Sequence, residues 1–366
     1  MRRFITRRPL LTAAIAFVLG ATVVAIAWAA VAAGGRTSTA TPTSPAPSPS
    51  PSDPAPSATP EPADPSDPSA CSGPTVTVDD PDGLQRALDD AAPGDRIQLL
   101  PGIYSGNFVA TVSGTPDSPI VLCGPAESVL DGGDVEDGYV LHLDGAQYWH
   151  LQGFTVTNGQ KGVMADGTVG SVIEGLTVTR IGDEAIHLRR FSTDNLVTGN
   201  RVSDTGLRRE KFGEGIYVGT AESNWCDISD CRPDTSDRNV IEGNTISAVT
   251  AEAIDVKEGT SFGIVRGNTF DGSGMVEDGA DSWVDIKGSD WLITGNTGRH
   301  SLLDGFQTHE IGDGGWGTRN TFSGNTAEVN GPGFGYSLTP VRDNVVTCDN
   351  TASNAGEGFS NVDCSD

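Results

Sequence analysis

A short apolar strand that ends in glycine recurs along the chain from residue 150 onward. Apolar and polar residues alternate within each copy, and no helical spacing of apolar residues separates the copies. The glycines stand at positions 153, 175, 199, 243, 267, 295 and 324, separated by 22, 24, 44, 24, 28 and 29 residues. Strands this short, repeated at coil length, can pair only with the equivalent strand one coil further on. The pattern predicts an all-β fold, a single right-handed parallel β-helix, in which the separation of 44 marks one coil with an insertion.

An asparagine directly follows this glycine in five copies. Glycine permits the tight turn that ends each strand, because it adopts left-handed backbone angles without a steric penalty. Stacked at one per coil, the asparagines predict an internal ladder of hydrogen bonds with a structural role. The ladder residues are Asn200, Asn244, Asn268, Asn296 and Asn325.

An amphipathic segment precedes the repeats. Residues 82–92 (DGLQRALDDAA) predict a short helix, and residues 93–104 (PGDRIQLLPGIY) predict a turn and a strand. Such a helix can cover the open N-terminal end of a solenoid. The two segments together resemble the start of the pectate-lyase-like β-helix superfamily, and the resemblance extends over residues 75–366. It implies the fold rather than a particular function.

Three zones of composition define the domain organisation. Residues 1–33 place four arginines before an uncharged apolar run, which is typical of an export signal. The run at residues 9–33 is also long enough to span a bilayer, so a membrane tether remains the alternative to cleavage. Residues 34–70 are rich in Ala, Pro, Ser and Thr and predict a disordered linker. Residues 71–366 form the β-helix domain, expected to be secreted or anchored facing outside.

All six cysteines lie in this domain, which predicts disulfides in an exported protein. Proximity alone favours the pairs Cys71–Cys123, Cys226–Cys231 and Cys348–Cys364. The net charge of −26 excludes nucleic acid as a partner. An acidic polysaccharide would need a local basic cluster or a bridging metal ion. We expect the protein to be a monomer.

A second recurring strand carries the candidate chemistry. Five copies align at residues 184–189 (EAIHLR), 214–219 (EGIYVG), 252–257 (EAIDVK), 282–287 (SWVDIK) and 304–309 (DGFQTH). Positions three and five are expected to face inward, and positions two, four and six to face solvent. Stacking at about 4.8 Å turns equivalent positions into columns. The first, fourth and sixth columns are Glu184, Glu214, Glu252, Ser282 and Asp304; His187, Tyr217, Asp255, Asp285 and Gln307; and Arg189, Gly219, Lys257, Lys287 and His309.

These columns place side chains of the same charge next to one another. Lys257 would lie against Lys287, and Asp255 against Asp285, which destabilises a sheet and therefore indicates a site. The alternative is a solvent-exposed sheet face without a functional site, on which charges pair across strands. The set of residues suits β-elimination on a uronate sugar, in which a cation must neutralise the sugar carboxylate.

Calcium is the expected cofactor, with the hard oxygen ligands Glu214, Glu252 and Asp255. Lys257 is the expected base, with a pKa that Lys287 and a bound calcium ion would lower.

Three side chains are candidates to protonate the leaving oxygen, namely Lys287, Tyr217 and His309. Residues 252–257 resemble the Glu-x-Ile-x-x-Lys strand of the alginate lyase and chondroitinase B family. That resemblance implies that Glu252 binds calcium and that Lys257 is the base. The family places an arginine donor one coil later, where this chain has Lys287. It places a ligand asparagine one coil earlier, near Glu214.

Several further residues are expected to contact substrate. Arg208 and Arg209 lie in the insertion, residues 207–238, which could wall a groove and bring basic groups to an acidic glycan. Trp283, expected to point outward, could stack on a sugar ring. The remaining outward candidates are His187, Arg189 and Asp285.

Two other functions remain open. A hydrolase on the same fold could use Asp255 and Asp285 as its carboxylate pair. No Asp-Asp pair of the polygalacturonase type stands in the five aligned strands, and the Gly-His-Gly segment of polygalacturonases and the Asp-Pro-His-Asp segment of mannuronan epimerases do not occur in the sequence. A non-catalytic β-helix that binds glycans or serves a structural role is the other alternative.

Overall fold

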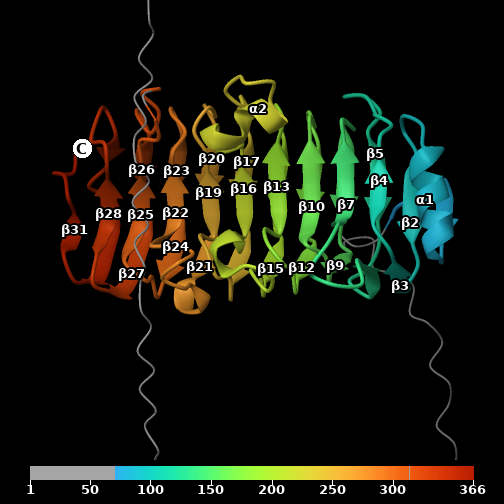
Figure 1. Cartoon of the computed structure of the whole chain (residues 1–366), viewed down its shortest axis with the longest axis horizontal. Coiled ribbons are helices and arrows are strands. Elements are labelled where there is room, and N and C mark those ends of the chain that lie inside the picture. The colour runs from blue at the N-terminus through green and yellow to red at the C-terminus, as the bar shows by residue number, and fades with distance from the viewer. Residues whose placement is uncertain (1–70, 313) are drawn as a thin grey trace, which may run out of the picture. The chain divides into compact units, whose positions relative to one another are not determined.

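The structure is a computed structural model that describes residues 71–312 and 314–366. The export signal or anchor (residues 1–33) and the linker (residues 34–70) lie outside the described residues. The described chain winds into a parallel β-solenoid with three sheets, in which every named strand pairs with its equivalents one coil away (Figure 1). The predicted parallel β-helix is therefore confirmed. No helix among the described residues is long and apolar enough to cross a membrane.

Sheet A contains the strands that end in the repeated glycine. These glycines have positive φ angles, for example 63° at Gly175, 64° at Gly199 and 88° at Gly153, as the tight turn requires. Its eleven strands are β1 (Val76–Val78), β2 (Arg96–Leu99), β5 (Ile120–Cys123), β8 (Trp149–Gln152), β11 (Val172–Glu174), β14 (Leu196–Thr198), β17 (Val240–Glu242), β20 (Ile264–Arg266), β23 (Leu292–Thr294), β26 (Thr321–Ser323) and β29 (Val345–Val346).

Sheet B follows each glycine turn and was not predicted. Its strands bury few side chains, often a single central one such as Val178 or Ile246, so no strong alternation marks them. Its ten strands are β3 (Gly102–Ser105), β6 (Ser128–Asp131), β9 (Thr155–Thr157), β12 (Thr177–Thr179), β15 (Arg201–Ser203), β18 (Thr245–Ser247), β21 (Thr269–Asp271), β24 (Thr297–Arg299), β27 (Thr326–Gly331) and β30 (Thr351–Ala355).

Sheet C holds the second recurring strand and crosses the view in Figure 1 from α1 to the C-terminal end. Its register aligns Tyr217 with Asp255 and Asp255 with Asp285, as the sequence alignment predicted. Its ten strands are β4 (Phe108–Ala110), β7 (Tyr139–Asp144), β10 (Lys161–Asp166), β13 (Ile186–Arg189), β16 (Ile216–Val218), β19 (Ile254–Val256), β22 (Ser282–Ile286), β25 (Asp304–Thr308), β28 (Phe334–Leu338) and β31 (Gly358–Ser360).

The predicted asparagine ladder lies inside the turn between sheets A and B. Asn268 shows the repeating unit: its Nδ2 donates to the Ile241 carbonyl and to Asn296 Oδ1, both at 2.9 Å. Its own Oδ1 accepts from the backbone and side chain of Asn244. Every polar atom of the buried amide is thus satisfied, which a buried polar group requires.

The N-terminal end of the solenoid is covered by α1 (Pro81–Asp89). Asp80 caps the helix by accepting from the Gly83 backbone, and Leu84 and Leu88 are fully buried. The predicted capping helix is therefore confirmed. Short helical turns lie at η1 (Glu210–Phe212), η2 (Glu222–Asn224), α2 (Trp225–Ile228) and η3 (Gly272–Gly274).

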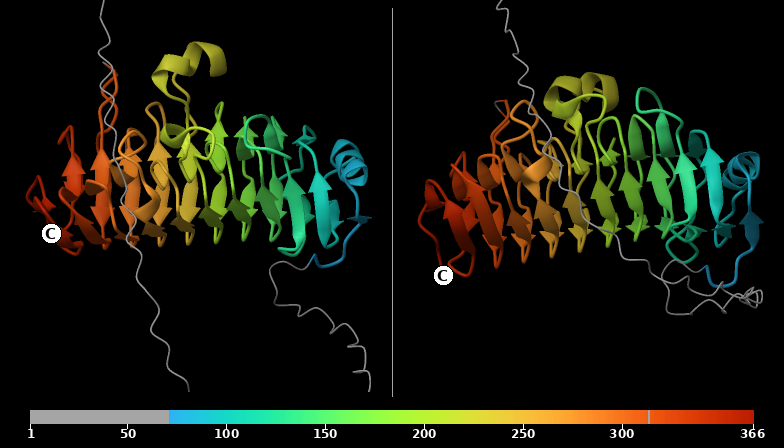
Figure 2. Two further views of the ribbon diagram at one scale, coloured as in Figure 1. Left: turned by 60° about the horizontal axis from the view of Figure 1, so that its bottom comes forward. Right: turned by 90° about the horizontal axis from the view of Figure 1, so that it is seen from below.

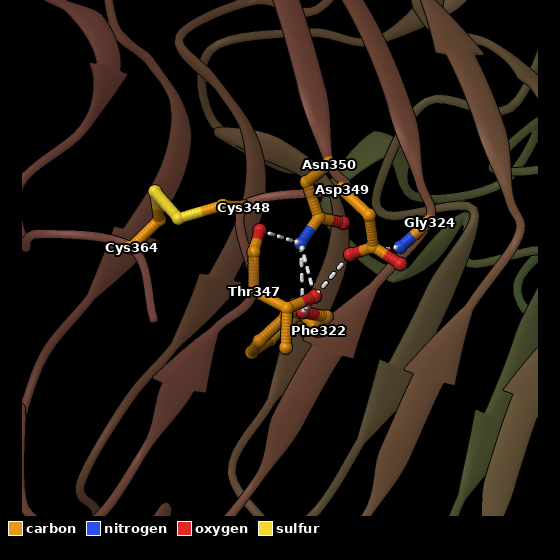
Figure 3. The surroundings of a disulfide bond; sticks show 7 residues. All are labelled: Phe322, Gly324, Thr347, Cys348, Asp349, Asn350 and Cys364. Atoms are coloured by element: carbon orange, nitrogen blue, oxygen red, sulfur yellow. Dashed lines mark hydrogen bonds between the residues drawn. A yellow bond between two sulfur atoms is a disulfide. The ribbon is translucent and has the colours of Figure 1, made fainter. Parts of the chain in front are cut away.

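All three predicted disulfides are present. Cys348–Cys364 ties the last residues to the final coil (Figure 3). Next to it, Ser365 pairs with Thr347 and adds one more rung after β29. Asp349 and Asn350 hold the same turn, through Gly324 and Phe322 respectively. The disulfide thus pins the edge of sheet A, where an unpaired strand would otherwise be exposed.

Candidate functional site

The outer face of sheet C forms the floor of a cleft of about 620 Å³. One wall is the loop between β16 and β17, the second part of the predicted insertion, which carries α2 and projects from the solenoid in both views of Figure 2. The other wall is the loop between β15 and β16, which carries η1. Smaller hollows continue the cleft past Lys287 toward His309. Ionisable lining residues are Lys161, Asp183, Glu184, His187, Arg189, Arg208, Lys211, Glu214, Tyr217, Asp227, Glu252, Asp255 and Lys257.

Three carboxylates meet at the floor, and they are the predicted metal ligands. One oxygen each from Glu214, Glu252 and Asp255 lie within 4.8 Å of one another. All three residues are buried, and Glu214 Oε2 has no hydrogen-bond partner among the described residues. Burial, together with the neighbouring carboxylates, raises the pKa of Glu214 well above its usual value and the pKa of Glu252 to about 8. Such a site favours a cation, which would remove both the repulsion and the unsatisfied oxygen.

Two lysines converge on the same aspartate. Lys257 Nζ lies 2.5 Å from Asp255 Oδ2, and Lys287 Nζ lies 2.7 Å from Asp255 Oδ1. Lys287 also contacts Asp285, at 2.6 Å. The predicted stacking of like charges therefore exists, but it is offset by an ion pair within each strand segment and by the Lys287–Asp255 pair between neighbouring strands.

The expectation of a lowered Lys257 pKa is wrong for the ion-free protein. Burial would lower it, but the charge and hydrogen bond of Asp255, with the charges of Glu214 and Glu252, raise it instead. The same balance of burial against Asp255 and Asp285 raises the pKa of Lys287.

Tyr217 lies one coil before Lys257, whose Nζ is 4.9 Å from the centre of the tyrosine ring. Burial and the charge of Asp255 raise the pKa of Tyr217, so the phenol keeps its proton. His187 packs edge-on against Tyr217, and its Nε2 contacts the Gly219 carbonyl at 2.9 Å. Burial lowers the pKa of His187, with help from Lys161, so this imidazole is neutral.

His309 and Asp285 form a pair at the far end of the floor. His309 Nδ1 lies 2.9 Å from Asp285 Oδ1, which raises the pKa of His309. Burial would raise the pKa of Asp285, but Lys287 and His309 lower it. An ionised Asp285 paired with His309 can orient a substrate but offers no carboxylic acid.

The remaining predicted contacts fall in different places. Arg189 lines the cleft and forms a bidentate pair with Asp166, and Arg208 lines it and pairs with Asp183. Arg209 is exposed and does not belong to the lining.

The outward orientation predicted for Trp283 is wrong. Its indole is fully buried, packs on Phe306 and donates to the Arg299 carbonyl. Added Cβ atoms on Gly298 or Gly305 would collide with this ring, so the two glycines make its space. Position two of the recurring strand therefore faces the core, as buried Ala185 and Ala253 also show.

Sequence reasoning missed Lys161 and Asp166, the first and last residues of β10. Lys161 pairs with Glu184, and Asp166 joins Arg189 to His142. The signal was present, because residues 161–166 (KGVMAD) share the pattern of residues 214–219, with glycine at position two. Asp166 also lies near His142 and Asp144 as a second candidate ligand group. Among the described residues, that group has no buried oxygen without a hydrogen-bond partner, whereas the first group has Glu214 Oε2.

Comparison with known proteins agrees with this geometry. No protein-family profile matches the chain. It is 28% identical over 317 residues to pectate lyase PEL9 of Emericella nidulans, covering 75% of this chain and 76% of that protein. The crystal structure of alginate lyase from Paenibacillus sp. str. FPU-7 superposes with a TM-score of 0.72 and 34% identity, covering 78% of this chain and 97% of the other. Pectate lyase Pel9A, at 15% identity and a TM-score of 0.50 over 74% of this chain and 72% of its own, shares the fold. With that coverage and identity to the Paenibacillus enzyme, the chain belongs to the parallel β-helix polysaccharide lyases.

Proposed function

We propose that this lyase cleaves a uronate-containing polysaccharide by β-elimination, with Lys257 as the base. One observation carries the proposal: Lys257, with only 14% of its side chain exposed, lies at the floor of a cleft beside three carboxylates that can hold a cation. The similarity to an alginate lyase and a pectate lyase supports a uronate as the substrate class. Alginate is the first polymer to test, because identity and coverage are both higher for the alginate lyase.

Glu214, Glu252 and Asp255 fit a calcium ion, since all three offer hard oxygen atoms and one oxygen is unsatisfied. A bound calcium ion would offset much of the negative charge of these carboxylates and of the sugar carboxylate. Burial then remains as the dominant influence on Lys257, and burial lowers the pKa of a lysine.

The reaction removes the proton at C5 of the uronate and breaks the bond between C4 and the glycosidic oxygen. Lys257 Nζ takes the C5 proton, the electron pair forms the C4–C5 double bond, and the leaving oxygen takes a proton. Tyr217 is the donor that the geometry favours, because it lines the same cleft as Lys257 and its raised pKa keeps the phenol protonated. Lys287 is held by two aspartates, and His309 lies in the adjoining hollow, so both suit substrate positioning better.

The hydrolase alternative fits less well. Both oxygens of Asp255 contact lysine ammonium groups, and the pKa of Asp285 is lowered. Neither aspartate is poised as the proton donor that a glycosidase needs. We also propose that the domain acts outside the cytoplasm, since three disulfides suit an oxidising compartment.

The full chain should be incubated with alginate, polygalacturonate and chondroitin sulfate, with calcium or with a chelator. The unsaturated product absorbs ultraviolet light, so a calcium-dependent rise in absorbance that Lys257→Ala lacks is expected. New reducing ends without absorbance would replace the lyase chemistry with hydrolysis. Neither signal, with polymer still bound, would favour a glycan-binding protein.

A further inference from the structure

The cations of the cleft differ in whether a carboxylate already holds them. Lys161 pairs with Glu184, Arg208 with Asp183, and Arg189 with Asp166. Lys257 pairs with Asp255. An anionic substrate can recruit these four groups only by competing with a carboxylate that is already in place.

Lys211 is different. It lines the cleft, its side chain is exposed, and no carboxylate among the described residues lies within ion-pair distance. Its Nζ lies 4.7 Å from the centre of the Phe212 ring, which also lines the cleft. The ammonium group and the ring thus lie together on the wall formed by the loop between β15 and β16, across the cleft from the loop that carries α2.

The loop that presents Lys211 is held in place. Thr250 Oγ1 donates to the Glu210 carbonyl at 2.6 Å, and the Phe212 backbone donates to the Arg209 carbonyl at 2.9 Å. Gly279 packs against the same Glu210 carbonyl, where an added Cβ would lie 2.9 Å away. A loop that is already held in place loses little conformational entropy when a ligand binds.

We propose that Lys211 binds a uronate carboxylate of the polymer away from the reacting sugar, with Phe212 as the apolar surface beside it. The inference rests on the proposed function, because it assumes that an acidic polysaccharide occupies this cleft. It goes beyond that function by assigning substrate affinity, rather than chemistry, to one cation on the wall. A charge-assisted contact of this kind is worth about tenfold in affinity.

Binding can be measured without turnover. The full chain carrying Lys257→Ala should be titrated calorimetrically with mannuronate and galacturonate tetrasaccharides in the presence of calcium. The same titration should be repeated after adding Lys211→Arg, Lys211→Ala or Lys211→Glu to that protein. We expect Lys211→Ala to raise Kd about tenfold, Lys211→Glu to raise it further, and Lys211→Arg to leave it near the parent value. The differences in Kd between these variants should become smaller at high salt. Arg201→Ala is the matched control, since Arg201 is an exposed cation on β15, away from the cleft.

In otherwise wild-type protein, Lys211→Ala should raise KM by the same factor and leave kcat unchanged. Equal Kd values across the Lys211 series would overturn the inference, as would an equal rise in Arg201→Ala. So would the failure of both tetrasaccharides to bind the Lys257→Ala protein. Tetrasaccharide binding that depends on Lys211, with no lyase activity in the wild type, would instead reject the proposed chemistry and keep Lys211 as a carboxylate-binding residue.

Discussion

Lys287 reaches back one coil to Asp255, and its Nζ lies 2.7 Å from Oδ1 of that residue. The same ammonium group contacts Asp285 on its own strand, at 2.6 Å. One lysine therefore bridges two aspartates that face each other in register. This arrangement permits a column of like charges at the floor of the cleft, where side chains are more than nine-tenths buried.

Replacing Lys287 should destabilise the protein strongly. In Lys287→Met, Asp285 would keep only His309 and Asp255 only Lys257, with the two carboxylates directly opposed. Breaking a buried pair from one side costs about 3 kcal/mol, and urea unfolding at neutral pH measures it. Arg238→Met is the control, because Arg238 forms an exposed pair with Asp194 that is worth less than about 1 kcal/mol. A loss no larger than in the control would show that Lys287 is dispensable to the fold.

Replacing Lys257 should abolish turnover while the protein remains folded. Lys257→Ala leaves Asp255 its contact with Lys287, so no carboxylate loses its last partner. Loss of the general base should lower kcat by about a thousandfold, measured by product absorbance at saturating substrate. The unfolding midpoint and the tetrasaccharide Kd provide the controls. A variant that keeps more than a tenth of wild-type kcat would rule out Lys257 as the base.

The seven glycines of sheet A were enough to predict the coil, since each needs a left-handed turn that most residues avoid. Sheet C was predictable in register, because inward Ile254, Val284 and Phe306 align in sequence as they do in space. The orientation of position two was not, because strict alternation fails where the chain enters the strand. The pKa of Lys257 also depended on distances that a sequence cannot supply.

Trp283 offers a direct test of that corrected orientation. The indole fills space beside Gly298 and Gly305 and does not line the cleft. Trp283→Phe should therefore lower the free energy of unfolding by about 2 kcal/mol, since a large core side chain becomes smaller. KM should stay at the wild-type value. A rise in KM without loss of stability would return Trp283 to the substrate surface.

Calcium binding should release protons and should become tighter as pH rises. Without the ion, the pKa of Glu252 is about 8, so Glu252 carries a proton near neutral pH, and the pKa of Glu214 is also raised well above its usual value. Ligand carboxylates must be ionised to bind the metal. Titration of calcium in two buffers of different ionisation enthalpy, at about pH 6 and about pH 8.5, measures the released protons. Glu252→Gln should release fewer protons at the lower pH, and proton release equal to that of wild type would contradict the assignment of Glu252 as a ligand.

The raised pKa of Glu252 also determines how the stability of the ion-free protein changes with pH. Because folding raises the pKa of Glu252 from its usual value to about 8, the folded state holds the proton more tightly than the unfolded state. The stability that this proton contributes is fully present below the pKa of Glu252 in the unfolded state, and it is lost as the pH rises toward 8. In chelator, the unfolding midpoint should therefore decrease as the pH is raised from about 5 to about 8. Added calcium should reverse this decrease, and most strongly at the higher pH. Glu252→Gln has no proton to lose at this position and should flatten the slope, whereas an unchanged slope would place the titrating group elsewhere.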